Sequence, residues 1–442
     1  MSRPAPRAGT SRQILAVAVP AFAALVAEPV MLLADTAMIG HLGTPELAGL
    51  AVASVVLTTA IGLCVFLAYG TTSAVARSHG AGREAEAGAQ AVGGLWLAAS
   101  LGVVLAVLTV ATAGPVATAL ASSPDVAGHA ATYLRISAAG VPAALLMLAA
   151  TGALRGVLDL RTPLVVTVSS CGANVALNAV LIYGLGWGVA GAALGTVVAQ
   201  WGAAAWLTAA VLRQLRTGEV SGRPRLDALL QAARAGVPLL VRTGTLRIAV
   251  LLATAVAATF GDASLAAHQV TATLVTLCAF ALDALAIAGQ TLTGRSLGAG
   301  DADLTRALTG QMVRWGWGVG AVIGTVLALA SPWVPGAFTS DSDVAAVLVP
   351  AVLAAALVQP LSGAVFVLDG VLIGAGDGRY LAAAGIVVLV VYAPLVLLVG
   401  VADAGLTWLW IAYAGFIGAR WVTLEHRRRS ERWIVLGPAA AS

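Results

Sequence analysis

Long apolar segments recur at short intervals along the whole chain, and this pattern limits the fold more than any other feature. A helix needs about 20 apolar residues to cross the hydrocarbon core of a bilayer, whereas a barrel strand needs about half that number. Hydrophobic residues make up 60% of the chain and charged residues only 10%, although about a quarter of the residues of soluble domains are charged. We therefore predict an all-α polytopic membrane protein with twelve transmembrane helices. The expected spans are residues 13–39, 47–72, 89–113, 131–154, 163–184, 189–212, 235–260, 265–291, 307–331, 344–372, 380–401 and 405–424.

Arginines occupy every second loop between the predicted spans, while the other loops contain no arginine and all but one of them contain acidic residues. Arg77, Arg155 and Arg295 lie in such loops, and a basic cluster at residues 427–432 follows the last span. Cytoplasmic loops carry the excess of positive charge, so we expect both termini on the cytoplasmic side of the cytoplasmic (inner) membrane. The N-terminal residues lack the short apolar region and cleavage site of a signal peptide, so we expect them to lead into an uncleaved first helix.

The two halves of the sequence repeat each other. RSHGAG begins at Arg77 and RSLGAG at Arg295, an offset of 218 residues, and LRGVLDLR and LIGAGDGR begin at Leu154 and Leu372 with the same offset. Because six helices per half is an even number, the halves should share one orientation and be related by an axis along the membrane normal. We predict two pseudo-symmetric six-helix lobes and a linker, at 1–212 (N-terminal lobe), 213–234 (cytoplasmic linker) and 235–442 (C-terminal lobe with a basic cytoplasmic tail).

The first predicted span carries two acids, Glu28 and Asp35, and a proline, Pro29, directly after the first acid. Ionisable residues inside a membrane are costly, face a bundle interior or a watery cavity, and often belong to proton pathways. The two acids are about two helical turns apart and can share a face. A proline inside a helix removes a hydrogen bond and allows a bend. We predict Asp35 as the proton site, Glu28 as the second candidate and Pro29 as a hinge.

Two asparagines, Asn174 and Asn178, lie one turn apart on the fifth predicted span. Amides within a membrane need hydrogen-bond partners, which could be a carboxylate, a substrate or a neighbouring helix, the last being common for Asn in membrane proteins. Thr196 on the sixth span could approach the same place. The residues alone leave these alternatives open.

Four charged residues lie deep within predicted spans of the second lobe: Asp283, Asp369, Arg242 and Arg247. Arg314 and Arg420 lie nearer the ends of their spans, where a long side chain can reach the membrane surface. Charged side chains in a membrane usually pair with one another, so buried ion pairs and a second functional site are both open interpretations. The sequence contains no Ser–His–Asp set, HExxH motif or zinc-type spacing. We therefore expect neither an enzyme nor a metal site.

Several motifs taken together resemble the multidrug and toxic compound extrusion (MATE) family, and in particular its DinF-like branch. These motifs are LADTAMIGHLG (33–43), LNAVLIYGLGWGVAGAALGT (177–196), AAHQVTATLVTLCAFALDALAIAGQ (266–290), RSLGAGD (295–301) and LDGVLIGAGD (368–377). The resemblance covers nearly the whole chain. It implies a twelve-helix antiporter in two lobes that exports cationic or amphipathic organic compounds in exchange for protons or sodium ions.

The resemblance also implies functional residues. In this branch the aspartate of the first helix, which matches Asp35, is the cation-coupling residue, and it shares a first-lobe cavity with polar residues that match Asn174, Asn178 and Thr196. Some relatives carry an aspartate at the position of Asn178, and the missing carboxylate favours protons over sodium here. Asp369 matches an acid of the tenth helix that other branches use.

The expected function is therefore export of a small organic molecule by alternating access, with the proton as coupling ion and sodium as the alternative. We expect a monomer that needs no cofactor and contacts only its substrate and the lipid bilayer, and no nucleic acid, because the basic residues belong to loops. Arg242 and Arg247 keep a lipid-linked sugar flippase of the same superfamily as an alternative, because such flippases need a wide, cationic cavity. A membrane-embedded transferase is the alternative of another class, and it would need a larger soluble loop than the linker provides.

Overall fold

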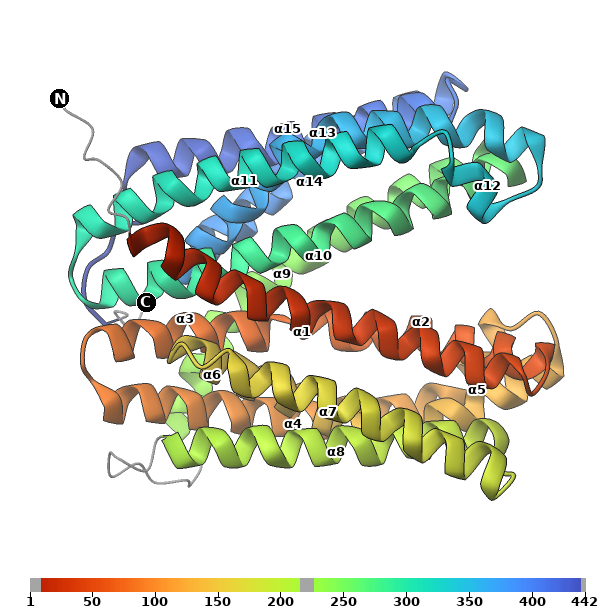
Figure 1. The fold of residues 1–442 in the computed structure, drawn as a ribbon, viewed down its shortest axis with the longest axis horizontal. Coiled ribbons are helices and arrows are strands. Elements are labelled where there is room, and N and C mark those ends of the chain that lie inside the picture. Colours follow the sequence, from red (N-terminus) through yellow and green to blue (C-terminus); the bar gives the residue numbers. More distant parts are fainter. Residues whose placement is uncertain (1–8, 215–225, 439–442) are drawn as a thin grey trace. The chain divides into compact units, whose positions relative to one another are not determined.

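The structure is a computed structural model that describes residues 9–214 and 226–438, and over these residues every regular element is a helix (Figure 1). The helices of the first half are α1 (Gly9–Gly40), α2 (Thr44–Leu63), α3 (Phe66–Gly80), α4 (Glu84–Leu120), α5 (Pro124–Ser137), η1 (Ala138–Gly140), α6 (Val141–Gly156), α7 (Arg161–Asn178), the π-helix η2 (Ala179–Gly184) and α8 (Gly188–Gln214). Those of the second half are α9 (Leu226–Thr259), α10 (Asp262–Gly298), α11 (Ala302–Ala330), α12 (Val334–Phe338), α13 (Ser342–Gly374), α14 (Gly378–Val401) and α15 (Leu406–Ser430).

Each predicted span corresponds to one helix or to one run of consecutive helices. The second span is formed by α2 and α3, the fourth by α5, η1 and α6, and the fifth by α7 and η2. Within the described residues, eleven helices are long and apolar enough to cross a membrane. The remaining predicted span is α15, a less apolar helix that carries Arg420 within the span and several tryptophans. The predicted all-α class is confirmed.

Large apolar side chains lie on the outside of these helices. Leu357 of α13 is 81% exposed and Val401 at the end of α14 is 87% exposed. A soluble protein rarely exposes large contiguous apolar patches, whereas in a bilayer such side chains contact lipid chains and need no protein partner. The exterior therefore agrees with the membrane assignment that the hydropathy pattern predicts.

The repeat predicted from the sequence is also present in the backbone. The turn after α3 contains Gly82 with φ +71°, and the turn after α10 contains Gly300 with φ +75°. The turn after α6 contains Leu158 with φ +66°, and the turn after α13 contains Gly376 with φ +74°. Each pair is separated by 218 positions in the sequence. The two halves therefore make the same left-handed turns at the same places, although only three of the four residues are glycine.

Close helix contacts follow the same repeat. A Cβ atom built on Gly102 of α4 would lie 2.5 Å from the Cα atom of Pro142 on α6. At the positions 218 residues later, a Cβ atom on Gly320 of α11 would lie 2.9 Å from the Cα atom of Pro360 on α13. Small residues allow membrane helices to approach this closely. The contact between α4 and α6 in the first half is therefore repeated between α11 and α13 in the second half.

The chain folds as two compact units, which differ from the predicted lobes at two places. The first-half unit contains Ala23–Gly236, and the second-half unit contains the residues up to Phe22 together with Val237–Gly437. Both changes of unit occur within a helix: α1 changes between Phe22 and Ala23, and α9 between Gly236 and Val237. The linker predicted at 213–234 lies partly outside the described residues.

Two side-chain hydrogen bonds agree with this division. In the second-half unit, the Nε2 atom of Gln311 on α11 donates a hydrogen bond of 2.6 Å to the Oγ atom of Ser11 on α1. In the first-half unit, the Nε2 atom of Gln90 on α4 donates a hydrogen bond of 3.1 Å to the Oε1 atom of Gln231 on α9. The beginning of each half's first helix therefore packs with the other half of the sequence.

Candidate functional site

The four residues predicted to couple transport to a cation lie together in the first-half unit. Asp35 of α1 is 5% exposed, and its Oδ1 atom accepts a hydrogen bond of 2.8 Å from the Nδ2 atom of Asn178. The same amide nitrogen lies 3.4 Å from the Oδ1 atom of Asn174, whose own Nδ2 atom donates to the Oγ1 atom of Thr196 at 3.0 Å. A single chain of hydrogen bonds therefore connects α1, α7 and α8, and its acid is at one end.

The helix that carries the asparagines changes its winding at this site. Asn178 is the last residue of α7, and the π-helix η2 begins at the next residue. A π-helical turn is rare and occurs often at functional sites. Tyr183 of η2 donates a hydrogen bond of 2.7 Å from its hydroxyl to the backbone carbonyl oxygen of Met38 on α1. No sequence motif indicated this change of winding.

α1 runs in the same direction as α7 and its continuation η2, and it is connected to them at three levels. The Sγ atom of Cys171 on α7 lies 3.5 Å from the carbonyl oxygen of Ala27 on α1. The Asp35–Asn178 hydrogen bond forms the second level, and the Tyr183 hydroxyl forms the third. The levels are separated by similar numbers of residues on both helices, as is required of parallel helices. Asp35 provides the only acidic side chain among these described contacts.

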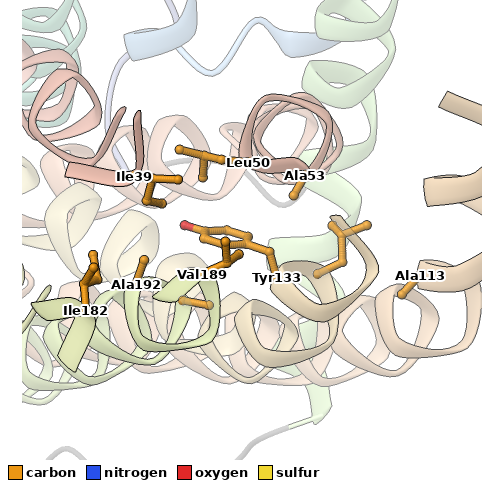
Figure 2. Close-up of a cluster of buried hydrophobic side chains, with 10 residues drawn as sticks. Ile39, Leu50, Ala53, Ala113, Tyr133, Ile182, Val189 and Ala192 are labelled. Atoms are coloured by element: carbon orange, nitrogen blue, oxygen red, sulfur yellow. The ribbon is translucent and has the colours of Figure 1, made fainter. Parts of the chain in front are cut away.

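Tyr133 of α5 is a residue of this site that sequence reasoning missed. Its side chain is 6% exposed and packs with Ile39, Leu50 and Val189 in a buried apolar cluster (Figure 2). Its hydroxyl is close enough to Thr196 and Asp35 to interact with both side chains. The sequence did contain one indication of its role. Tyr133 places a hydroxyl within a predicted span, and a buried tyrosine usually finds a hydrogen-bond partner.

Gly195 of α8 is a second residue that sequence reasoning did not single out. A Cβ atom built on it would overlap the Oδ1 atom of Asn178. That oxygen is buried and has no hydrogen-bond partner among the described residues. Buried polar atoms without a partner are uncommon and call for an explanation. Here α8 leaves just enough room for the amide, and only a glycine permits it.

Asp369 of α13, in the second-half unit, has different partners. Its Oδ1 atom accepts a hydrogen bond of 3.1 Å from the Nε atom of Arg242, and its Oδ2 atom accepts one of 3.2 Å from the Nη2 atom of Arg420. The Arg420 guanidinium also lies 5.6 Å from the ring centre of Phe366. The buried ion pair is therefore the arrangement that the structure shows for Asp369 and Arg242, and Arg420 completes it.

The other predicted candidates differ in their exposure. Asp283 of α10 is half-buried and has an electrostatic or hydrogen-bond partner, while Arg247 of α9 is exposed. Pro29 lies within the continuous helix α1. The side chain of Glu28 lies outside the described residues, so its role stays a prediction.

Repeated helical halves with membrane-buried polar residues define a multi-pass membrane transporter. The MatE family model matches this chain twice, at residues 20–180 and at residues 238–398, with the same offset as the internal repeat. The chain therefore belongs to the MatE family, whose members are efflux transporters rather than enzymes.

Several relatives and solved structures are similar over most of their length. The chain is 31% identical to Protein DETOXIFICATION 44, chloroplastic, of Arabidopsis thaliana over 97% of this chain and 84% of the relative. It is 28% identical to the DNA damage-inducible protein F of Escherichia coli over 92% of this chain and 90% of the relative. A MOP superfamily transporter from Pyrococcus furiosus has the same fold, with a TM-score of 0.87, 22% identity, and coverage of 95% of this chain and 96% of that chain. The predicted architecture of twelve transmembrane helices in two lobes is thus confirmed.

Proposed function

We propose that this transporter exports amphipathic or cationic organic molecules in exchange for protons, and that Asp35 is the residue that binds the proton. The observation that supports this proposal best is the environment of Asp35. It is a buried carboxylate whose described hydrogen-bond donor is a neutral amide, that of Asn178. Among the residues that the structure describes, none forms an ion pair with it.

Asp369 provides the comparison within the same chain. Both aspartates are buried in membrane helices, but Asp369 is bound by the guanidinium groups of Arg242 and Arg420. A carboxylate between two arginines stays ionised, because protonation would break two ion pairs and leave buried positive charge. Asp35 can gain and lose a proton without breaking an ion pair. It is therefore the better coupling residue of the two.

Protonation would change the hydrogen bonds around Asp35. The hydrogen bond from Asn178 would lose the strength that an ionised acceptor gives it. The protonated acid would also become a donor and need an acceptor. A half-turn of the Asn178 amide would present its unpartnered Oδ1 atom to that donor. We infer that the amide of Asn178 responds to the protonation state of Asp35.

This local change acts on α1, because Asp35 is the middle of the three levels that attach α1 to α7. Weakening the middle level leaves the part of α1 near Pro29 less restrained, and a proline inside a helix favours a bend. Antiport also requires that proton and substrate favour different conformations, or compete for one site. A change in α1 that follows protonation meets this requirement.

Relatives support the class of substrate. The chain is 25% identical to a probable multidrug resistance protein of Thermotoga maritima over 75% of this chain.

The alternative of a lipid-linked sugar flippase depended on Arg242 and Arg247 as positive charges that line a cavity. Arg242 is bound to Asp369 instead, which leaves this alternative with less support.

We propose the cytoplasmic membrane as the location, with both termini in the cytoplasm, because the arginines occupy alternate loops.

Proteoliposomes test the role of Asp35. We expect Asp35→Asn to abolish drug-driven proton flux while drug binding persists, because the amide keeps the size of the side chain and cannot bind the proton. Asp403→Asn, at an exposed turn, is the matched control and should keep the flux of the unchanged protein. Proton and sodium gradients imposed separately on the same vesicles identify the coupling ion. Coupled proton flux that persists in Asp35→Asn would refute the proposal.

A further inference from the structure

A groove of about 620 Å³ opens at the end of the first-half unit where α6 is followed by α7 and where α8 ends. It is lined by Asp159, Trp206, Ala209, Arg213 and other residues of the same two regions. Trp206 is 51% exposed, and tryptophans are enriched where a membrane meets water. The groove therefore lies at the height of lipid headgroups, on the side of the arginine-rich loops.

The internal repeat shows what fills the same place in the second-half unit. The turn that carries Asp159 and the turn that carries Asp377 have the same backbone hydrogen bonds: Asp159 N donates to Leu154 O at 2.9 Å, and Asp377 N donates to Leu372 O at 3.0 Å. Each of these residues is 218 positions from its counterpart. The two carboxylates thus begin from equivalent backbone positions.

Asp377 is bound by an arginine of its own unit. The Nε and Nη2 atoms of Arg427 donate hydrogen bonds of 2.6 and 3.2 Å to its two oxygens. The guanidinium lies 4.8 Å from the ring centre of Tyr380, so an aromatic face supports the cation. Arg427 and Asp377 therefore form a bidentate salt bridge, which is stronger than a single neutral hydrogen bond.

The first-half unit lacks both of these side chains. The position equivalent to Arg427 is Ala209, and the position equivalent to Tyr380 is Thr162. Asp159 instead accepts hydrogen bonds from Thr162 N at 3.0 Å, from Thr162 Oγ1 at 2.7 Å and from Gln214 Nε2 at 2.9 Å. None of these donors is charged. The groove therefore occupies the place where a cation and its aromatic support lie in the other half.

We propose that this groove binds the headgroup of a phosphatidylethanolamine-type lipid, whose ammonium group takes the place of the Arg427 guanidinium. The ammonium donates hydrogen bonds to the Asp159 carboxylate, and Arg213, one helical turn beyond Ala209, binds the phosphate. Two opposite charges at the edge of one membrane groove fit a zwitterion better than they fit a simple cation. A primary ammonium is also preferred over a quaternary one, because only the primary group has N–H donors for the carboxylate.

Native mass spectrometry of the full chain in detergent tests this proposal. We expect adducts of phosphatidylethanolamine to survive at collision energies that remove phosphatidylcholine and phosphatidylglycerol. Asp159→Asn should weaken ethanolamine-lipid binding about tenfold, since a hydrogen bond to a charged group contributes roughly 1.5 kcal/mol or more. Asp377→Asn is the matched control, because it changes the equivalent carboxylate in the half where Arg427 already binds it, and it should leave lipid binding unchanged.

A second variant keeps the proposal testable if Asp159→Asn fails to fold. Ala209→Arg together with Thr162→Tyr rebuilds the second-half arrangement and should exclude the lipid while raising the thermal stability. Equal binding of the ethanolamine lipid by this variant and by the unchanged protein would overturn the proposal. So would equal retention of the three lipids. Displacement of the lipid by free ethanolamine at low concentration would instead show a site for soluble cations and also refute a lipid site.

Discussion

At the scale of single residues, the chain contains two buried aspartates with opposite surroundings. Asp369 has two arginine partners, whereas Asp35 is bound by the amide of Asn178. The first arrangement fixes a charge inside the membrane and the second allows the charge to change. Gly195 determines the position of the Asn178 amide beside Asp35, because α8 contacts this amide at Gly195.

Gly195→Ala should therefore uncouple transport without removing any functional group. The added methyl group would overlap the Oδ1 atom of Asn178, and the amide would have to move away from Asp35. We expect a protein that reaches the membrane in normal amounts but shows much less drug-driven proton flux. Gly202→Ala, on the same helix with open space around the new Cβ atom, is the control. Normal coupling in Gly195→Ala would show that the Asn178 position does not matter.

At the scale of secondary structure, the repeat predicts where the backbone is strained. The turn after α6 places Leu158 at φ +66°, and the equivalent turn after α13 uses Gly376 at φ +74°. A residue with a side chain in this left-handed region costs about 1–2 kcal/mol. At this turn the first half therefore retains a strain that the second half avoids.

We expect the usual order of glycine and alanine to be reversed at Leu158. Glycine is ordinarily less stabilising than alanine by about 0.5–1 kcal/mol in regular elements. At this turn Leu158→Gly removes the strain, while Leu158→Ala keeps it and loses the packing of the leucine side chain. Thermal unfolding in detergent should therefore place Leu158→Gly above Leu158→Ala. An alanine variant that is more stable than the glycine variant would contradict the strained turn.

The sequence predicted the spans and the repeat well, because apolar length and repeated motifs are properties of the chain itself. It also indicated that Asp35, Asn174 and Asn178 could meet. It did not identify Tyr133, Gly195 or the π-helix η2, because hydropathy gives the depth of a residue and not its neighbours. For the same reason it left the pairing of Asp369 open, and the partner Arg420 became evident only in the structure.

At the scale of the whole molecule, the two compact units do not coincide with the two halves of the sequence. The residues up to Phe22 belong with Val237–Gly437, and the start of α9 belongs with the first half. Local sequence could not predict this exchange, because Ser11 and its partner Gln311 are 300 residues apart. Each half therefore contains a segment that completes the other.

Expression of the protein in two pieces tests this exchange. A cut between residues 214 and 226 gives two fragments. The first fragment lacks the start of α9, which belongs to the first-half unit, and the second lacks the start of α1, which belongs to the second-half unit. We expect little of either fragment to accumulate in membranes when it is expressed alone, and both to accumulate when they are expressed together. Immunoblots of washed membranes measure the amounts. A second fragment that is abundant and folded by itself would show that the first residues of α1 add little.

The early position of α1 in the chain has a consequence for biosynthesis. Ser11 leaves the ribosome when Gln311, its partner 300 residues later, has not yet been translated. At about 5–20 residues per second, the interval is roughly 15 to 60 s. During this time the opening turns of α1 wait for their final neighbours while the following helices enter the membrane. The contact between Ser11 and Gln311 can therefore form only late in translation. We expect the second-half unit to complete its folding at that late stage, after its first segment has already been in the membrane for some time.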